Sequence, residues 1–394
     1  MATFDVVFSS GGTKAVAFAG AVEVLVQKKH TIRRLVGTSA GGISVALLGA
    51  GFSIGELLDI FSGKQGKSLF AGFIQYPDAV QVLEAVQQED SETRLWLKQA
   101  ISRTVDQSID ALVQKTPKLA LGLKVALGLV PRDELYEKAY KAFFDVRPDN
   151  RTQLIPLLAF LEFGGFLTSD PIVKWLSETV REKLPKFPAN GTFAQFHEMT
   201  GRDMSIVAAD TTAKIPLILN HRTAPDCPVF EAVRMSMSIP MVWPEVAWQA
   251  GWGKYQGNAI TGHYIVDGGA MLNLPIHLFA EANEERVKRV MGDPPAGAAL
   301  PLGLLLDEML PVAGDVAKPE LPTSKLIGRM GRLIDTVTRW EDDVIRRHEA
   351  VVCRIPSLGY SAVEFATNPE RLEVLINSGR CAMQEHLQQR KIVG

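Results

Sequence analysis

A serine and an aspartate, Ser39 and Asp267, are the residues of this chain best suited to chemistry. Ser39 is the centre of Gly37-Thr38-Ser39-Ala40-Gly41, a G-x-S-x-G pentapeptide. Such a pentapeptide holds a serine on a tight turn between a strand and a helix, with its hydroxyl standing clear of the sheet. The glycines leave room for the strained backbone. The pentapeptide therefore predicts a nucleophile, although the same spacing also occurs in turns without chemistry.

A glycine pair lies upstream of this pentapeptide. Gly11 and Gly12 follow an apolar run, Phe4–Phe8, and precede Thr13 and Lys14. A strand, a glycine turn and a helix N-terminus together direct several backbone N–H groups at one point. Such a point can bind a phosphate or stabilise an oxyanion. The G-x-G-x-x-G and G-x-x-x-x-G-K-[ST] spacings of phosphate loops are absent, so an oxyanion hole is the better interpretation beside a candidate nucleophile.

Asp267 ends a strand-like run, Tyr264–Val266, and is followed by Gly268 and Gly269. A carboxylate at the end of a strand is well placed to face a cleft. An Asp-Gly pair is also common in turns in which the aspartate caps its own backbone. The residues alone leave both interpretations open.

The elements expected around these residues alternate between strand and helix. Strands are expected at Phe4–Phe8 and Arg34–Val36, each leading into one of the two glycine-containing turns. A helix with valine and alanine along one face is expected over Ala15–Gln27, and a helix of small apolar residues over Ala40–Ala50. This alternation indicates an α/β domain.

Taken together, the motifs resemble those of the patatin-like phospholipase family, in an order and spacing that make the set specific. Ser10–Ala15 is similar to the family's G-G-G-x-[RK]-G oxyanion loop, and Gly37–Gly41 to its nucleophile elbow. Asp267–Pro275 is similar to its D-G-G-x-x-x-N-x-P box. Arg234–Pro240 resembles its R-x-S-x-[AS]-x-P helix, and Ile206–Asp210 a core strand.

The resemblance implies a three-layer α/β/α sheet with a large helical insertion, and a serine acyl hydrolase that cleaves fatty-acyl esters of phospholipids or related lipids. In that mechanism Ser39 attacks the ester carbonyl and forms an acyl-enzyme, and Asp267 is the base. A solvent-exposed aspartate, with a pKa of about 3.9, is a poor base for a hydroxyl. Burial raises that pKa, so the mechanism requires Asp267 to lie in a largely dry cleft.

The remaining site residues are also implied by the resemblance. The oxyanion is expected to be held by backbone N–H groups of Gly11, Gly12, Thr13 and Ala40. The residues expected to support these groups are Lys14, Gly37, Gly41, Gly268 and Gly269. Ser10 and Ala15 stand where the family carries glycine, and Ser10 still offers a backbone N–H. No metal or organic cofactor is expected, and no D-x-[DN]-x-[DN]-G calcium loop is present.

Other functions remain open from the sequence. An α/β-hydrolase would need a histidine base after the acid, and the histidines that follow Asp267 are His277, His348 and His386. His277 lies in an apolar stretch and is expected to pack, whereas His348 and His386 are expected on solvent-exposed helix faces. A lipid acyltransferase would use the same serine and oxyanion hole. A catalytically weak lipid-binding or regulatory protein is the alternative from a different class.

Composition is ordinary for a globular protein. The chain has 394 residues, of which 46% are hydrophobic and 22% charged, and its net charge of -2 gives no reason to expect nucleic acid as a partner. The three cysteines show neither metal-ligand nor disulfide spacing, which suits a reducing compartment. No secretory leader is evident at the N-terminus. A cytoplasmic location is therefore expected, with attachment to a membrane surface as an addition; the oligomeric state stays open.

One uncharged stretch, Leu35–Ile54, has the length of a membrane span. We reject that interpretation because the stretch is rich in glycine, serine and threonine and contains the pentapeptide itself.

Because the candidate catalytic residues are so far apart in sequence, one domain over residues 1–394 is expected to hold both. Residues 55–200 are expected to form a mainly helical insertion or lid. Residues 291–325, rich in proline and glycine, are expected to form an irregular excursion. Helices are expected over Ile327–Ala350 and Pro369–Leu387.

Three apolar groups could either pack or meet lipid. Leu119–Val130 and Leu154–Phe166 are too short to span a bilayer and are expected to be buried helices rather than parts of a lid. An aromatic group follows Pro240 and consists of Trp243, Trp248, Trp252 and Tyr255. It could line an active-site rim, but a hairpin that packs against the sheet is expected.

Overall fold

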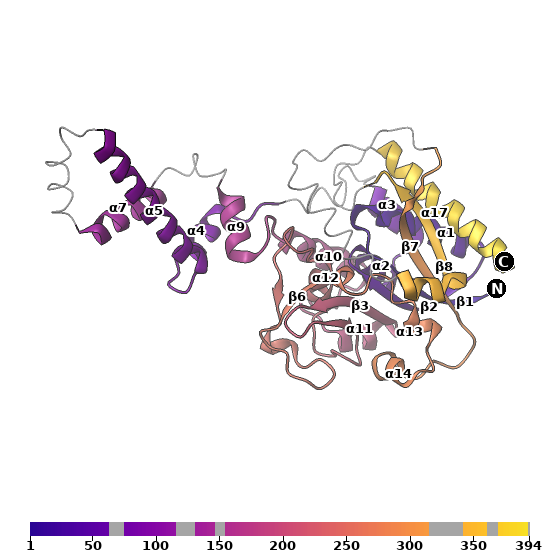
Figure 1. The fold of residues 1–394 in the computed structure, drawn as a ribbon. Coiled ribbons are helices and arrows are strands. Elements are labelled where there is room, and N and C mark those ends of the chain that lie inside the picture. The colour runs from indigo at the N-terminus through magenta and orange to yellow at the C-terminus, as the bar shows by residue number, and fades with distance from the viewer. Residues whose placement is uncertain (63–74, 116–130, 146–153, 315–341, 361–368, 393–394) are drawn as a thin grey trace. The chain divides into compact units, whose positions relative to one another are not determined.

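The computed structural model describes residues 1–62, 75–115, 131–145, 154–314, 342–360 and 369–392 (Figure 1). The chain divides into two compact units. Unit 1 comprises residues 1–75 and 168–394, and unit 2 comprises residues 76–167. Each unit contains a hydrophobic cluster of its own.

Unit 1 is built on a mixed sheet that has eight strands in the described residues, in the order β5-β6-β3-β2-β1-β7-β8, with β4 also paired to β3. The strands are β1 (Thr3–Phe8), β2 (Thr31–Thr38), β3 (Asp203–Asp210), β4 (Ile215–Leu219), β5 (Val246–Ala247), β6 (Tyr264–Asp267), β7 (Leu300–Pro311) and β8 (Val352–Leu358). Strands β3, β2, β1, β7 and β8 are parallel, while β4, β5 and β6 pair antiparallel. Consecutive residues of β1 and β3 are buried, so both faces of these parallel strands are covered.

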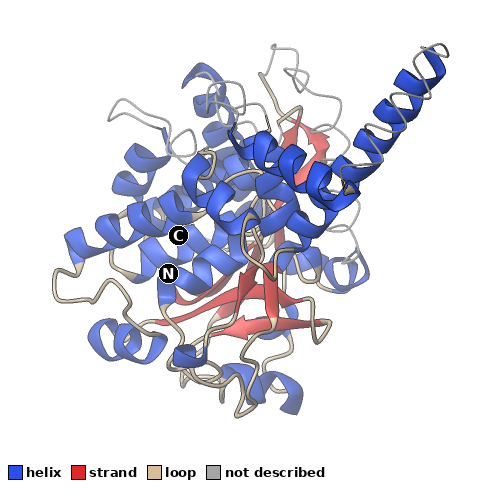
Figure 2. Cartoon of the chain, turned by 90° about the vertical axis from the view of Figure 1, so that its left-hand side faces the viewer, coloured by secondary structure: helices blue, strands red, loops and turns tan. Residues whose placement is uncertain are grey.

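Helices cover both faces of this sheet, as Figure 2 shows. On one face, Val7, Val36 and Val207 of three neighbouring strands share a cluster with α13 (His277–Ala280) and α14 (Glu285–Met291). Successive strand residues point to opposite faces. On the other face, Phe8 therefore meets Phe18 edge to face, with ring centroids 5.4 Å apart. The expected α/β/α layering is confirmed.

The remaining helices of unit 1 lie between the strands along the chain or after the last strand. They are α1 (Val16–Gln27), α2 (Ala40–Gly49), α3 (Ile54–Ser62), α10 (Asp170–Lys183), α11 (Phe193–Thr200), α12 (Val229–Met237), α16 (Asp342–Arg347) and α17 (Pro369–Gln389). The expected closing helix is α17, and its backbone lies directly against the backbone of α1. A Cβ on Gly379 would lie 2.0 Å from the carbonyl oxygen of Ala17, and one on Gly20 would lie 2.1 Å from that of Ile376.

Unit 2 is helical in its described residues. It contains α4 (Ala79–Val86), α5 (Glu92–Lys115), α7 (Arg132–Asp145) and α9 (Ile155–Phe163). Its core joins Val82 and Leu97 to Tyr140 and Leu158. Every regular element described between residues 55 and 200 is a helix, but the separately packed unit is shorter than that range, because α3, α10 and α11 belong to unit 1.

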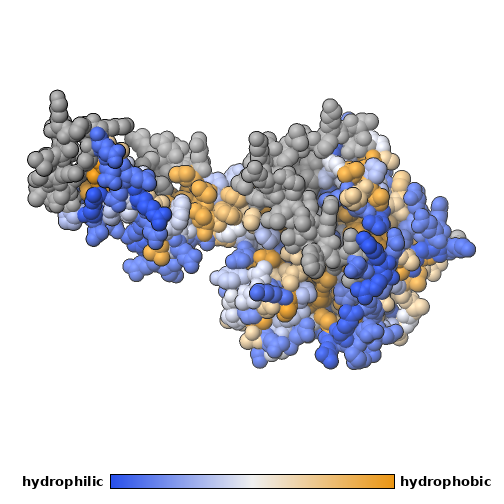
Figure 3. Space-filling model, viewed as in Figure 1, coloured by the Kyte–Doolittle hydropathy of each residue, from blue (hydrophilic) through white to orange (hydrophobic). Residues whose placement is uncertain are grey.

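The two apolar runs expected as buried helices differ in outcome. Leu119–Val130 lies outside the described residues. In the second run, α9 buries Ile155 and Leu158 but leaves Leu157 and Leu161 more than 40% exposed. Apolar side chains gather over α9 in Figure 3, whereas α5 is largely hydrophilic. The expected packing therefore holds for one face of α9, and the other face is exposed.

The irregular excursion expected over residues 291–325 is wrong in its central part. Leu300–Pro311 forms β7, which pairs with β1 on one side and β8 on the other. Its apolar run, Leu302–Leu306, is buried on both faces, as in other central parallel strands. Pro301 is compatible with the strand because it is the second residue, before the pairing with β8 begins at Gly303. Residues 315–325 lie outside the described ranges.

The aromatic group after Pro240 packs, as expected from the sequence. Trp243 and Trp248 are no more than 2% exposed and Tyr255 is 5% exposed. Trp252 packs edge to face on Trp248. The tyrosine hydroxyl accepts a hydrogen bond from the N–H of Ile218 at 3.1 Å, which ties the segment to β4. These rings therefore do not line an open rim.

None of the helices in the described ranges is both long enough and apolar enough to cross a membrane. Leu35–Ile54 forms the end of β2, the elbow, all of α2 and the start of α3. Of the helix expected over Ile327–Ala350, only residues from 342 onward are described, and they contain α16.

Candidate active site

Ser39 and Asp267 meet because two strands run toward each other along one edge of β3. β4 pairs along the second half of β3 and takes the far edge. On the near edge, β2 runs parallel and ends at Thr38 opposite Val207. β6 runs antiparallel on the rest of that edge and ends at Asp267 opposite Ala208. Val207 and Ala208 are consecutive, so β2 and β6 end next to each other. Ser39, the residue after Thr38, therefore lies beside Asp267.

The serine hydroxyl and the carboxylate are in direct contact. Oγ of Ser39 donates a hydrogen bond to Oδ2 of Asp267 at 2.5 Å, and both side chains are almost fully buried. Ser39 has φ 55° and ψ -123°, a backbone conformation that non-glycine residues rarely adopt. Strain of this kind persists only where the surrounding structure enforces it, and it gathers at functional sites. The turn between β2 and α2 is therefore a strained elbow that presents the serine.

Burial changes the acid-base properties of Asp267. The carboxyl group is 5% exposed, and this desolvation raises its pKa to about 7. Hydrogen bonds from Ser39 and from the backbone N–H of Gly269, the latter at 2.7 Å, act in the opposite direction. The dry surroundings that the sequence argument required are present. A carboxylate with a pKa near neutrality is a far better proton acceptor than an exposed one.

The predicted oxyanion loop follows β1 and lies beside both halves of the pair. Gly12 opens the 3₁₀ turn η1 (Gly12–Ala15) with φ 55°, in the left-handed region that favours glycine. A Cβ on Gly41 would lie 2.7 Å from the carbonyl oxygen of Ser9, so the loop touches the start of α2. A Cβ on Gly269 would lie 3.2 Å from Oγ of Ser10. Gly11, Gly12, Thr13 and Ala40 thus belong to segments that border the Ser39–Asp267 pair.

Ser10, which replaces a family glycine, is held by a side chain from the aspartate box. Oδ1 of Asn273 accepts hydrogen bonds from the Ser10 backbone N–H at 2.8 Å and from its hydroxyl at 2.7 Å. The N–H of Ser10 is therefore engaged in fixing the loop.

Lys14 is buried rather than solvated. Its side chain is 3% exposed, and its ammonium group forms an ion pair with Glu308 near the end of β7. Leu306 of the same strand also packs against the loop: a Cβ on Gly11 would lie 2.1 Å from Cδ1 of Leu306. The end of β7 thus supports the loop by charge and by packing.

The supporting glycines are required by close backbone approaches. A Cβ on Gly37 would lie 2.4 Å from the carbonyl oxygen of Gly41, across the elbow. One on Gly268 would lie 2.4 Å from the carbonyl oxygen of Val207 in β3. Larger residues would push the elbow and the aspartate turn away from the sheet.

The histidines expected to be uninvolved lie elsewhere in the structure. His277 is partly buried in α13, where desolvation lowers its pKa to about 4. His348 lies within 3.0 Å of Glu281. His386 is 8% exposed, so its predicted place on a solvent face is wrong: it faces the interior from α17. The base in contact with Ser39 is a carboxylate, and none of these three histidines is its hydrogen-bond partner.

Comparison with known proteins identifies the family. A family model described as Patatin-like phospholipase matches residues 6–280. The chain belongs to the patatin-like phospholipase family. The matched region of this patatin-like protein begins in β1 and ends with α13, and so contains the loop, the elbow and the aspartate turn.

Two curated relatives are similar in sequence. The uncharacterized protein YqhO of Bacillus subtilis is 25% identical over 294 residues, which cover 73% of this chain and 69% of YqhO. A viral protein described as "Probable lipid hydrolase 463L", from Invertebrate iridescent virus 6, is 25% identical over 126 residues. That match covers 32% of this chain and 39% of the viral protein.

Two bacterial proteins of solved structure are also similar. VipD from Legionella pneumophila gives a TM-score of 0.45 at 15% identity, over 98% of this chain and 67% of VipD. ExoU from the type III secretion system of Pseudomonas aeruginosa, solved in complex with SpcU, gives a TM-score of 0.40 at 16% identity. This chain spans 52% of that ExoU chain.

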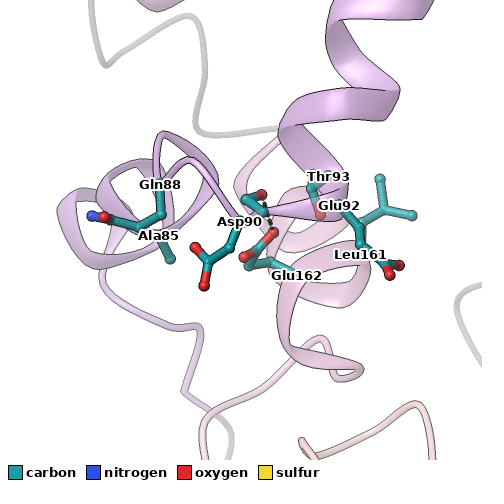
Figure 4. A pocket seen from close by; sticks show the side chains of 8 residues that line it. Ala85, Gln88, Asp90, Glu92, Thr93, Leu161 and Glu162 are labelled. Carbon is teal, nitrogen blue, oxygen red and sulfur yellow. Dashed lines mark hydrogen bonds between the residues drawn. The ribbon is translucent and has the colours of Figure 1, made fainter.

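A hollow of about 300 Å³ lies in unit 2, outside the patatin-like site (Figure 4). Asp90, Glu92 and Glu162 give it an acidic lining, and the hydroxyl of Ser91 donates to Glu162 at 2.7 Å. Across the described ranges, no group of three or more His, Cys, Asp or Glu side chains is arranged to hold a metal ion.

Several residues at the site were not found by sequence reasoning. Glu308 was missed because the segment around it was expected to be irregular. Asn273 and Ser236 were quoted within family motifs, but nothing in their spacing indicated what they contact. Their partners, Ser10 and Ser39, are 263 and 197 residues away in the chain.

Proposed function

We propose that this chain is a serine acyl hydrolase that cleaves fatty-acyl esters of phospholipids or related lipids, with Ser39 as nucleophile and Asp267 as base. Membership of the patatin-like phospholipase family supports lipid hydrolysis as the reaction. The observation that carries the assignment of residues is the 2.5 Å hydrogen bond from a strained serine to a buried carboxylate with a raised pKa.

The reaction follows from this geometry in two steps. Oγ of Ser39 attacks the ester carbonyl carbon while its proton passes to Oδ2 of Asp267. Backbone N–H groups of Gly11, Gly12, Thr13 and Ala40 stabilise the oxyanion that forms. The bond to the alcohol then breaks, and the alcohol leaves with the proton from the aspartic acid. Water attacks the acyl-serine, returns a proton through Asp267, and releases the fatty acid and free Ser39.

We further propose that the enzyme binds its lipid substrate at a membrane. Long-chain lipid esters reside in membranes, so the reaction takes place at a membrane surface that the protein contacts without spanning it. A cytoplasmic location is consistent with the three cysteines, all free, of which Cys227 and Cys353 are buried.

The test combines covalent labelling with product release. Wild-type protein is expected to react with a fluorophosphonate probe and to release fatty acid from mixed phospholipid vesicles. Ser39→Ala and Asp267→Asn are each expected to lower the rate of fatty-acid release by at least about a thousandfold, because each removes a group from the reacting unit. Ser205→Ala, a buried serine on β3 that contacts Asn220 instead, is the matched control and is expected to stay active.

Each failure has a distinct meaning. Full activity in Ser39→Ala would place the nucleophile elsewhere. Labelling of wild type without fatty-acid release would exclude the proposed lipid esters as substrates. Transfer of the acyl group to a lipid alcohol in preference to water would identify an acyltransferase.

A further inference from the structure

The C-terminal turn of α12 contacts both members of the Ser39–Asp267 pair. The Oγ of Ser236 accepts a hydrogen bond from the backbone N–H of Ser39 at 2.8 Å. The carbonyl oxygen of Ser238 accepts one from the backbone N–H of Asp267 at 2.9 Å. Both serines are fully buried. A single helix end is thus hydrogen-bonded to the two residues whose side chains meet.

The hydrogen-bond directions at Ser236 are fixed by its partners. The backbone carbonyl of Val207 can only accept, so the Ser236 hydroxyl donates its one proton there, at 2.5 Å. Its lone pairs are then left to receive the N–H of Ser39, which can only donate. Val207 is the β3 residue paired with Thr38, at the point where β2 ends. The hydroxyl therefore ties the strained elbow to the sheet at the junction of β2 and β6.

The turn that carries these contacts is itself closed. Oγ of Ser238 donates to the carbonyl oxygen of Arg234 at 2.9 Å, and the N–H of Ser238 donates to the carbonyl oxygen of Met235. Arg234 in turn forms ion pairs with Glu231 and Asp170. Helix α12 also packs on α2, on β3 and on β6. The anchor is therefore a rigid part of the fold.

We propose that Ser236 is a positioning residue, and that the C-terminal turn of α12 sets the distance between Oγ of Ser39 and the carboxylate of Asp267. The proposal rests on the proposed function of that pair. Without the Ser236 hydroxyl, the N–H of Ser39 would be left buried without its acceptor, and the elbow would lose the contact that opposes its backbone strain. The serine would then relax away from Asp267.

Two substitutions test the role of the hydroxyl. Ser236→Ala removes the acceptor, and Ser236→Cys keeps nearly the same shape but offers only a weak one. Both are expected to lower kcat for ester hydrolysis by roughly tenfold to a hundredfold, with KM changed by less than about threefold, because a small misplacement acts on the chemical step. Ser205→Ala is the matched control, since Ser205 is also fully buried on β3 and accepts one hydrogen bond, from Asn220 at 3.0 Å.

A second measurement does not depend on activity. The pKa of Asp267 is read by NMR on protein with ¹³C-labelled aspartate carboxyls, assigned with Asp267→Asn. The hydrogen bond from Ser39 holds this pKa down against desolvation. In Ser236→Ala the pKa is expected to rise toward the value in Ser39→Ala, whereas in Ser205→Ala it is expected to match wild type.

The outcomes separate the two proposals. An unchanged Asp267 pKa in both Ser236 variants would overturn the positioning role, whatever their kcat. A shifted pKa together with a wild-type enzyme that hydrolyses no ester would support the positioning role and refute the proposed function. Equal kcat in Ser236→Ala and Ser205→Ala would also count against positioning, since lost packing alone would then account for the change.

Discussion

At the scale of single residues, Asp267 combines two opposing demands. In the proposed mechanism its carboxylate must be dry enough to act as a base, and a dry carboxylate is costly to ionise. Its pKa of about 7 in the folded protein lies well above the ordinary aspartate value of 3.8. The same shift that suits the residue to proton transfer therefore makes the stability of the fold depend on pH.

The sign of this dependence follows from proton binding. Between about pH 4 and pH 7 the unfolded chain has lost the Asp267 proton, while the folded chain retains it. The folded state binds more protons, so raising the pH favours unfolding. The contribution of Asp267 to stability is fully present below about pH 4 and is lost as the pH rises through about 7.

Asp267→Asn removes this titration. We expect the variant to gain stability over wild type as the pH rises from 4 to 8, by up to about 4 kcal/mol, with the difference measured by urea unfolding at each pH. Ser205→Ala, which leaves the carboxyl in place, should show a constant offset from wild type. A constant offset for Asp267→Asn as well would mean that the carboxyl is not protonated in the fold near pH 6.

The sequence could predict Ser39 and Asp267 because local rules act on them. The elbow needs glycines within two residues of the serine, and the aspartate turn needs glycines directly after the acid. The partner of Lys14 is different, because nothing near this lysine in the chain shows that Glu308 neutralises it. Contacts of this kind become visible only when β1 and β7 are paired.

At the scale of elements, the start of α2 shows how closely helix and loop approach. Gly41 and Gly42 are consecutive residues of this helix with different surroundings. A Cβ on Gly41 would lie 2.7 Å from the backbone carbonyl oxygens of Phe8 and Ser9. One on Gly42 would make only an ordinary contact, at 3.6 Å, with Ile206 and Ser236.

The two glycines should therefore respond in opposite ways to alanine. Gly42→Ala is expected to stabilise the protein by up to about 1 kcal/mol, because alanine is the better helix former. Gly41→Ala is expected to destabilise it by more than about 1 kcal/mol and to slow fluorophosphonate labelling at least about tenfold, since the proposed oxyanion loop must move. Thermal unfolding and labelling rates measure both. Equal labelling rates in the two variants would show that the loop tolerates the displacement.

The elements that sequence reasoning placed well have a marked boundary. Gly11 and Gly12 separate β1 from α1, Gly37 and Gly41 flank the elbow, and α17 begins at a proline. β7 was missed because the prolines and glycines around it are typical of loops, and its pairing with β1 and β8 outweighs that local signal. The exposed stripe of α9 was missed because an apolar sequence does not say which of its faces a helix will bury.

At the scale of the whole molecule, the chain leaves unit 1 and returns to it at one point. The N–H of Thr168 donates to the carbonyl oxygen of Gln75 at 2.9 Å, so the residues on either side of unit 2 are hydrogen-bonded to each other. The core of unit 2 consists of its own residues. A short linker can therefore join Gln75 to Thr168 in place of unit 2.

We expect a chain in which about four Gly and Ser residues replace residues 76–167 to unfold cooperatively and to label with fluorophosphonate at a rate within about tenfold of wild type. Removal of α17, which packs on α1 through Gly20 and Gly379, is the contrasting control and should prevent folding. Thermal unfolding followed by circular dichroism tests the cooperativity, and the labelling rate tests the site. An aggregated product from the first replacement would show that unit 1 depends on unit 2.

The meeting of β2 and β6 on one edge of β3 also has a consequence for the nascent chain during synthesis. Ser39 emerges from the ribosome early, but its partner is 228 residues further along. Until Asp267 has been made and β6 has paired with β3, the serine lacks its carboxylate partner. On the proposed mechanism, a nascent or truncated chain that ends before Asp267 is therefore expected to be inactive toward esters.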